Sequence, residues 1–152
     1  MPTIQILINM IVNLLKDKES NREKLFRISK SCIGLDVSRY YDDVGCMETV
    51  NKLYELATGK PILAGLVSAI RGLEIFESDS RFKETIEPRP GYIIISATEG
   101  RNIGHVGVIS DNEKILANNS SNSRVEEKYT RESWIKFYTI DKGLTTRFFK
   151  VL

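Results

Sequence analysis

Histidine, cysteine and tryptophan are scarce in this 152-residue chain, which has one histidine, two cysteines and one tryptophan. Two cysteines are too few for a disulfide scaffold, so we expect free thiols and regard a Cys32–Cys46 bridge as the less favoured alternative. With a single histidine, a Cys/His structural zinc site would need carboxylate ligands, and the sequence implies no metal or organic cofactor. Any mechanism that needs an imidazole must use His105.

The chain also lacks an excess of charge of either sign. Lys and Arg total 22 against 20 Asp and Glu, which gives a net charge of +2. A dedicated nucleic-acid binder needs a concentrated basic face, so we expect no nucleic-acid partner. The hydrophobic fraction of 41% and the charged fraction of 28% are those of an ordinary globular protein, and the length suits one domain.

The strongly apolar segment Ile4–Leu15 is shorter than the roughly twenty residues that a spanning helix needs. No basic segment precedes it and no small-residue cleavage site follows, so we expect no conventional signal peptide. A narrow polar stripe recurs at helical spacing: Gln5, Asn9, Asn13 and Lys16. Residues 1–18 therefore form a predicted helix that either packs on the main domain, residues 19–152, or contacts a membrane or a partner protein.

The main domain divides into predicted helices followed by predicted strands. Ser20 with Glu23 indicates a helix start, a third helix runs from about Cys46 to Gly59, and a shorter one lies around 66–73. From residue 92 the hydrophobic period changes to two. The expected strands are 92–97, 105–110, 114–119, 125–129 and 145–152, with a short helix over 131–138. Helices followed by a meander of strands indicate an α+β fold.

Cys46 is expected to open the third helix. The free N–H groups and the dipole there favour an anion, so we expect the pKa of this thiol to be lowered. The backbone N–H groups of Cys46 and Met47 could also hold the oxyanion of a tetrahedral intermediate. The alternative role, a small buried hydrophobic residue, suits Cys32 better, because we expect it to lie mid-helix on an apolar face.

His105 opens a predicted strand between two glycines, Gly104 and Gly107. We expect these glycines to leave open space around the imidazole, as a general base requires. Asn118, at the end of the next strand, could accept the second ring N–H and fix the tautomer. Asn119 is the alternative one residue further on, and both asparagines also suit a polar turn.

Four segments occur in an order that resembles a known family: Gly45–Asn51, Pro90–Ser96, Gly104–Ile109 and Asn118–Ser121. They resemble the CHAP and NlpC-type cysteine peptidases and amidases that cleave peptidoglycan, particularly compact bacteriophage forms. The resemblance covers the chain from about residue 25 onward. It implies a papain-like α+β fold with N-terminal helices on a curved antiparallel sheet, and catalytic residues Cys46, His105 and Asn118.

Two residues depart from the family pattern. Tyr92 stands where the family usually has aspartate, and Met47 follows the cysteine where a small residue is common. The first departure puts a structural hydrogen bond in doubt, and the second alters the expected substrate groove. Tyr40 and Tyr41 precede the nucleophile and are candidates for lining that groove.

The resulting hypothesis is a cysteine peptidase or amidase that acts on peptidoglycan peptides, in phage lysis or cell-wall entry. Such a protein would be made in the bacterial cytoplasm without a conventional signal peptide, or carried by a virion, and would act on the cell wall. A non-catalytic wall-binding or virion structural module of the same fold is the alternative, because a fold does not fix a function. A second alternative is a hydrolase that acts on protein.

Overall fold

The computed structural model describes residues 3–38, 45–97 and 104–152, with residues 12–17 described by their backbone alone. The helices are α1 (Ile4–Lys18), α2 (Asn21–Ser31), α3 (Gly45–Thr58), α4 (Ala69–Ser78) and α5 (Arg131–Trp134), which continues as the π-helical segment η1 (Ile135–Asp141). The strands are β1 (Phe82–Thr85), β2 (Ile93–Ala97), β3 (Gly104–Ile109), β4 (Lys114–Asn119), β5 (Arg124–Thr130) and β6 (Thr146–Val151).

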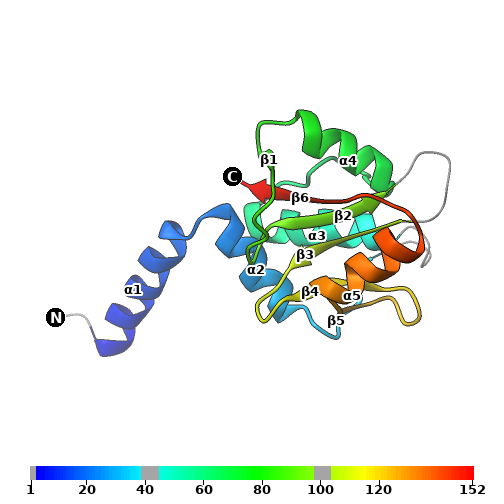
Figure 1. The fold of residues 1–152 in the computed structure, drawn as a ribbon. Helices are drawn as coiled ribbons and strands as arrows, with labels where there is room; N and C mark the ends of the chain where they lie inside the picture. The colour runs from blue at the N-terminus through cyan, green and yellow to red at the C-terminus, as the bar shows by residue number, and fades with distance from the viewer. Residues whose placement is uncertain (1–2, 39–44, 98–103) are drawn as a thin grey trace.

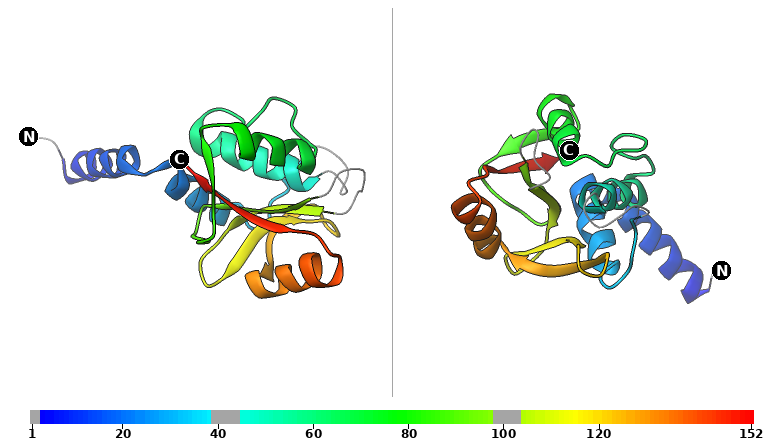
Figure 2. Two further views of the ribbon diagram at one scale, coloured as in Figure 1. Left: turned by 45° about the horizontal axis from the view of Figure 1, so that its top comes forward. Right: turned by 90° about the vertical axis from the view of Figure 1, so that its right-hand side faces the viewer.

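Over the described ranges, the strands form one antiparallel sheet in the order β1-β6-β2-β3-β4-β5. The C-terminal strand β6 inserts between β1 and β2, so that β2 and β3 lie in the middle of the sheet. Figure 2 shows that the sheet bends between β2 and β5 and does not close on itself. The predicted α+β fold class, with helices packed on a curved antiparallel sheet, is confirmed.

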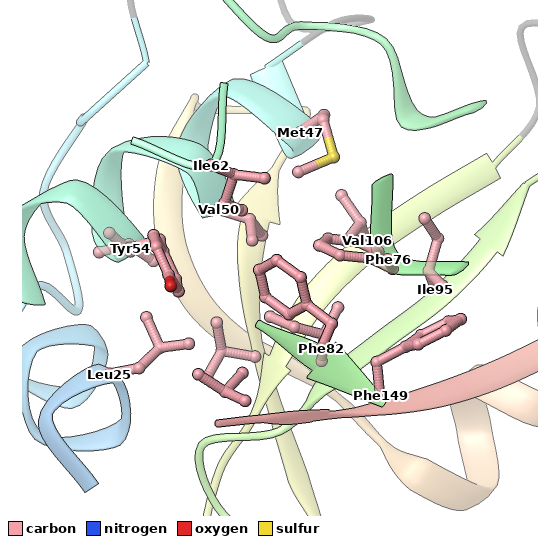
Figure 3. Packing of buried hydrophobic residues seen from close by; sticks show 14 of the residues in the cluster. Leu25, Met47, Val50, Tyr54, Ile62, Phe76, Phe82, Ile95, Val106 and Phe149 are labelled. Carbon is pink, nitrogen blue, oxygen red and sulfur yellow. The ribbon is translucent and has the colours of Figure 1, made fainter. Parts of the chain in front are cut away.

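One face of the sheet carries α2, α3 and α4 (Figures 1 and 2). The apolar positions of α3 recur at helical spacing, and Met47, Val50 and Leu53 are all fully buried. They pack in one cluster with Val106 and Val108 of β3 (Figure 3). This core presses the first turn of α3, which contains Cys46, onto β3.

The other face of the sheet is covered by α5 and η1, which contribute Trp134 and Tyr138 to a second cluster. Ile94 belongs to this cluster, whereas Ile93 and Ile95 belong to the first. Both faces of β2 are therefore buried, which explains why its sequence is apolar without alternation.

Local sequence signals account for most element boundaries. Ser20 caps α2, because its side chain accepts the backbone N–H of Glu23, as predicted. The turn between β3 and β4 carries Asn112 at φ 53°, a left-handed conformation that asparagine tolerates. The predicted helix over 66–73 is displaced, since Ser68 caps α4 and the helix runs from 69 to 78. The short edge strand β1 was not predicted, because Phe82 is its one buried residue.

Helix α1 extends away from the rest of the molecule (Figures 1 and 2). Its apolar side chains over residues 4–11 are exposed, from 43% for Leu7 to 77% for Ile4. Packing of these residues on the main domain is therefore excluded. Within the described residues, no helix is long and apolar enough to cross a membrane. Contact of α1 with a membrane surface or a partner stays a prediction.

Candidate active site

Cys46 lies in the first turn of α3 and is partly buried. The backbone N–H groups of Val106, Met47 and Cys46 itself surround its sulfur and favour the thiolate. Desolvation outweighs them, and the pKa of the Cys46 thiol is raised above its ordinary value. The predicted lowering of this pKa is therefore wrong, and the side chain is a neutral thiol at neutral pH.

His105 stands on β3 directly opposite Ser96 of β2, and 9% of it is exposed. Its ring stacks on the indole of Trp134, with centroids 4.9 Å apart and an interplanar angle of 9°. Two further rings complete an aromatic box, since Tyr138 lies 5.8 Å and Tyr129 6.2 Å from the imidazole centroid. The name aromatic box is used below for Tyr129, Trp134 and Tyr138.

Burial in the aromatic box lowers the pKa of His105 to about 4, and the nearby charge of Lys128 contributes in the same direction. The imidazole is therefore neutral at physiological pH and has a lone pair free to accept a proton. The Cys46 thiol, with its raised pKa, and the neutral His105 imidazole therefore both carry no charge at rest. This arrangement avoids the desolvation cost of a buried ion pair.

The glycines of β3 do not open space around the imidazole, so that expectation is wrong. A Cβ atom at Gly107 would lie 2.7 Å from the Ile115 side chain and 2.9 Å from the carbonyl oxygen of Leu116. A Cβ atom at Gly104 would lie 2.7 Å from the Ser96 carbonyl oxygen. Glycine is required at both positions because the neighbouring strands approach β3 closely.

The Cys46 side chain reaches the backbone of β3 at the residue after His105. The Cys46 sulfur lies beside the N–H of Val106, the residue that follows His105. Tyr138, a member of the aromatic box, is close enough to Cys46 for the thiolate charge to act on its hydroxyl. Burial, then Tyr129 and Cys46, raise the pKa of Tyr138, so this phenol stays protonated. Tyr138 was not among the predicted site residues, because η1 contacts the site only through the tertiary fold.

Asn118 lies on the α3 side of the sheet. Its amide nitrogen would be 2.9 Å from a Cβ atom at Gly45, so it packs directly against the residue before Cys46. It is 2% exposed, and neither amide atom has a hydrogen-bond partner within the described part of the chain. The predicted hydrogen bond from His105 to Asn118 is thus not formed in this structure.

Strand register explains why Asn118 does not reach the His105 ring. Leu116 pairs with Val108, and both belong to the core under α3; Asn118, two residues on, points to the same face. The His105 ring points to the opposite face, into the aromatic box. Asn119 does point to that face, but its amide donates to Glu126 at 2.7 Å and its carbonyl oxygen accepts from Ser121.

The remaining predicted site residues have mixed outcomes. The backbone N–H groups of Cys46 and Met47 lie at the start of α3 and face the Cys46 sulfur, and their role as oxyanion donors stays a prediction. Tyr40 and Tyr41 fall outside the described residues. Both cysteines carry free thiols. Across residues 3–38, 45–97 and 104–152, no group of three or more His, Cys, Asp or Glu side chains could hold a metal ion.

No protein-family model matches the chain, and no curated protein sequence matches it. The fold is similar to that of a chain in the crystal structure of the type VI native effector-immunity complex Tae3-Tai3 from Ralstonia pickettii. The two chains share 16% sequence identity with a TM-score of 0.54, over 88% of this chain and 100% of that one. At this identity the likeness concerns the fold, and it extends over nearly the whole chain.

Proposed function

We propose that this chain is a cysteine hydrolase that cleaves peptide or amide bonds of bacterial peptidoglycan. The observation that carries the proposal is the position of the Cys46 sulfur at the backbone N–H of Val106, the residue after His105. A thiol in the first turn of a helix lies against the strand that holds the only histidine, and that histidine is neutral. The resemblance of the motifs to wall-cleaving enzymes supports the substrate class, and the fold shared with an effector-immunity chain is consistent with it.

In the proposed reaction, the neutral imidazole of His105 removes the thiol proton while the Cys46 sulfur attacks an amide carbonyl carbon. The carbonyl π electrons move to oxygen, and the backbone N–H groups of Cys46 and Met47 donate to the resulting oxyanion. The intermediate collapses, the carbon–nitrogen bond breaks, and His105 returns the proton to the leaving amine. A thioester on Cys46 remains.

Water completes the cycle. His105 takes a proton from the water molecule while its oxygen attacks the thioester carbonyl. Collapse of the second intermediate breaks the carbon–sulfur bond and releases a carboxylic acid, and His105 returns its proton to the departing sulfur, which restores the thiol and the neutral imidazole. The same proton acceptor serves both steps, which is why a chain with one histidine suffices.

Asn118 is the third residue in this proposal. An unpaired amide buried in protein costs stability, roughly 1–3 kcal/mol, and a functional use would explain its retention. Its position beside Gly45 favours an action on the first turn of α3, where the nucleophile and the oxyanion donors lie. Its contact is therefore with the nucleophile's helix and not with the imidazole.

Digestion of purified peptidoglycan tests the function. The wild type and Cys32→Ala should release fragments with new amine and carboxylate termini that mass spectrometry locates, while Cys46→Ala should release none. Cys32→Ala is the matched control, because Cys32 is buried at the end of α2. Binding to peptidoglycan without new termini would instead favour a non-catalytic wall-binding module. Cleavage of protein alone would favour a hydrolase that acts on protein.

A further inference from the structure

We propose that Trp134 is a positioning residue for His105: a hydrogen-bonded indole that fixes the plane of the imidazole and supports the imidazolium formed during turnover. The inference rests on the proposed function only in assigning His105 as the base. The stacking itself can be tested without any substrate.

The stacking geometry is the first observation. At 4.9 Å and 9° the two rings are nearly parallel, whereas Tyr129 meets the imidazole edge-on at 70°. Trp134 is fully buried, so it also shields one face of the imidazole from water. A parallel stack restricts rotation of the imidazole about its last side-chain torsion, which is otherwise broad.

The second observation is that the indole itself is anchored. Its Nε1–H donates to the hydroxyl of Ser96 at 2.9 Å, and Ser96 is the residue directly opposite His105. The Ser96 hydroxyl is 2.8 Å from that of Thr146, which is 2.7 Å from that of Thr139. This hydroxyl chain links β2, β6 and η1, so three elements fix the position of the indole.

The backbone fixes the other end of Trp134. Thr130 and Ser133 form a reciprocal capping box that starts α5 directly after β5. Trp134 occupies the next position, so the orientation of α5 sets the direction of its side chain. Tryptophan suits this role because it combines a broad π face with an N–H donor at its edge.

The chemistry of turnover supplies the reason for an indole. When His105 accepts the thiol proton it becomes a cation in a site where burial disfavours charge. The face of an aromatic ring attracts a cation, and tryptophan does so most strongly. The titratable groups that contact or act on His105 are Lys128 and Tyr129 on β5 and Tyr138 on η1. Over the described residues, no carboxylate contributes to the pKa of His105 or stabilises its imidazolium form.

The experiment is an NMR titration of His105 in full-length wild type, Trp134→Leu and Ser96→Ala. One histidine gives one Cε1–H signal, which the indole ring current should shift upfield in the wild type. In Trp134→Leu this signal should move downfield, and the pKa of His105 should fall below its wild-type value, because leucine keeps the site apolar but removes the aromatic face that attracts the imidazolium. On wall fragments, kcat should fall at least about tenfold with KM unchanged, since positioning affects the transition state.

Phe76→Leu is the matched control, because Phe76 is buried on the opposite face of the sheet. It should lose comparable stability and leave the His105 signal, its pKa and kcat unchanged. Should Trp134→Leu fail to fold, Ser96→Ala still tests the anchor, and it should broaden or shift the same signal. An unchanged His105 signal and pKa in the folded variants would overturn the inference. If the wild type cleaves no peptidoglycan while the signals shift as expected, the proposed function fails and the positioning role stands.

Discussion

The depressed pKa of His105 should make the stability of the protein depend on pH in a defined window. In the native state the imidazole gains a proton only near pH 4, whereas in the unfolded chain it does so near 6.5. Between these values the unfolded state binds more protons than the native state, so stability falls as the pH falls. The difference of 2.5 pKa units corresponds to about 3 kcal/mol lost by pH 4, from burial of the imidazole in the aromatic box.

Urea unfolding of the wild type and His105→Gln from pH 8 to pH 4 measures this contribution. Carboxylates with lowered pKa values, such as Asp79 and Glu84, also lose stabilising interactions as the pH falls. Glutamine does not titrate, so the difference between the two proteins isolates His105. The wild type should lose about 3 kcal/mol more than the variant. Parallel curves for the two proteins, or an NMR titration of the single histidine with a midpoint above 6, would refute the reasoning.

Three further predictions follow from the site and from α1. In a Cys32→Ser background, iodoacetamide should alkylate Cys46 more slowly than a free thiol at the same pH, because its pKa is raised, and fast labelling at pH 6 would contradict this. Asn118→Leu should raise the free energy of unfolding by roughly 1 kcal/mol and reduce wall cleavage at least about tenfold. Asn119→Leu should leave cleavage nearly unchanged. Equal losses of cleavage in the two variants would contradict the assignment of Asn118 as the third site residue. Deleting residues 2–11 should change the free energy of unfolding, measured by urea, by less than about 0.5 kcal/mol. It should also abolish binding to vesicles or partners. Loss of folding would show that α1 is part of the core.

The elements of the fold were largely predictable, because they depend on local signals. Period-two patterning found β2 through β6, and the Ser20 cap found the start of α2. Strand β1 was not predicted, because a short edge strand with one buried residue has no alternating pattern to detect. The order of β6 between β1 and β2 was also beyond local reasoning, since it is decided by packing between distant segments.

The candidate site was predictable in its chemistry and less so in its geometry. Scarcity singled out His105 and Cys46, and the Cys46 sulfur lies beside the N–H of Val106, the residue after His105. The environment of each was predicted wrongly, because burial determines their pKa values and burial is a tertiary property. Trp134 was visible as the only tryptophan, yet its stack on His105 depends on α5 crossing the far face of the sheet.

The face to which each asparagine points depends on strand register, and this is where the sequence was most ambiguous. A shift of one residue exchanges Asn118 and Asn119 between the two faces. Pairing of Leu116 with Val108 settles the register and sends Asn118 toward Gly45. A hairpin turn whose type is uncertain by one residue could not have fixed this in advance.

The central claim is that Cys46 forms a covalent acyl-enzyme with a wall peptide. Acid quenching during turnover of peptidoglycan fragments, followed by peptide mapping, measures it directly. We expect the peptide that contains Cys46 to carry the mass of the acyl fragment, hydroxylamine to remove it, and His105→Gln to accumulate far less of it. Cleavage of wall fragments with no adduct on Cys46, or an adduct on Cys32 in its place, would contradict the account.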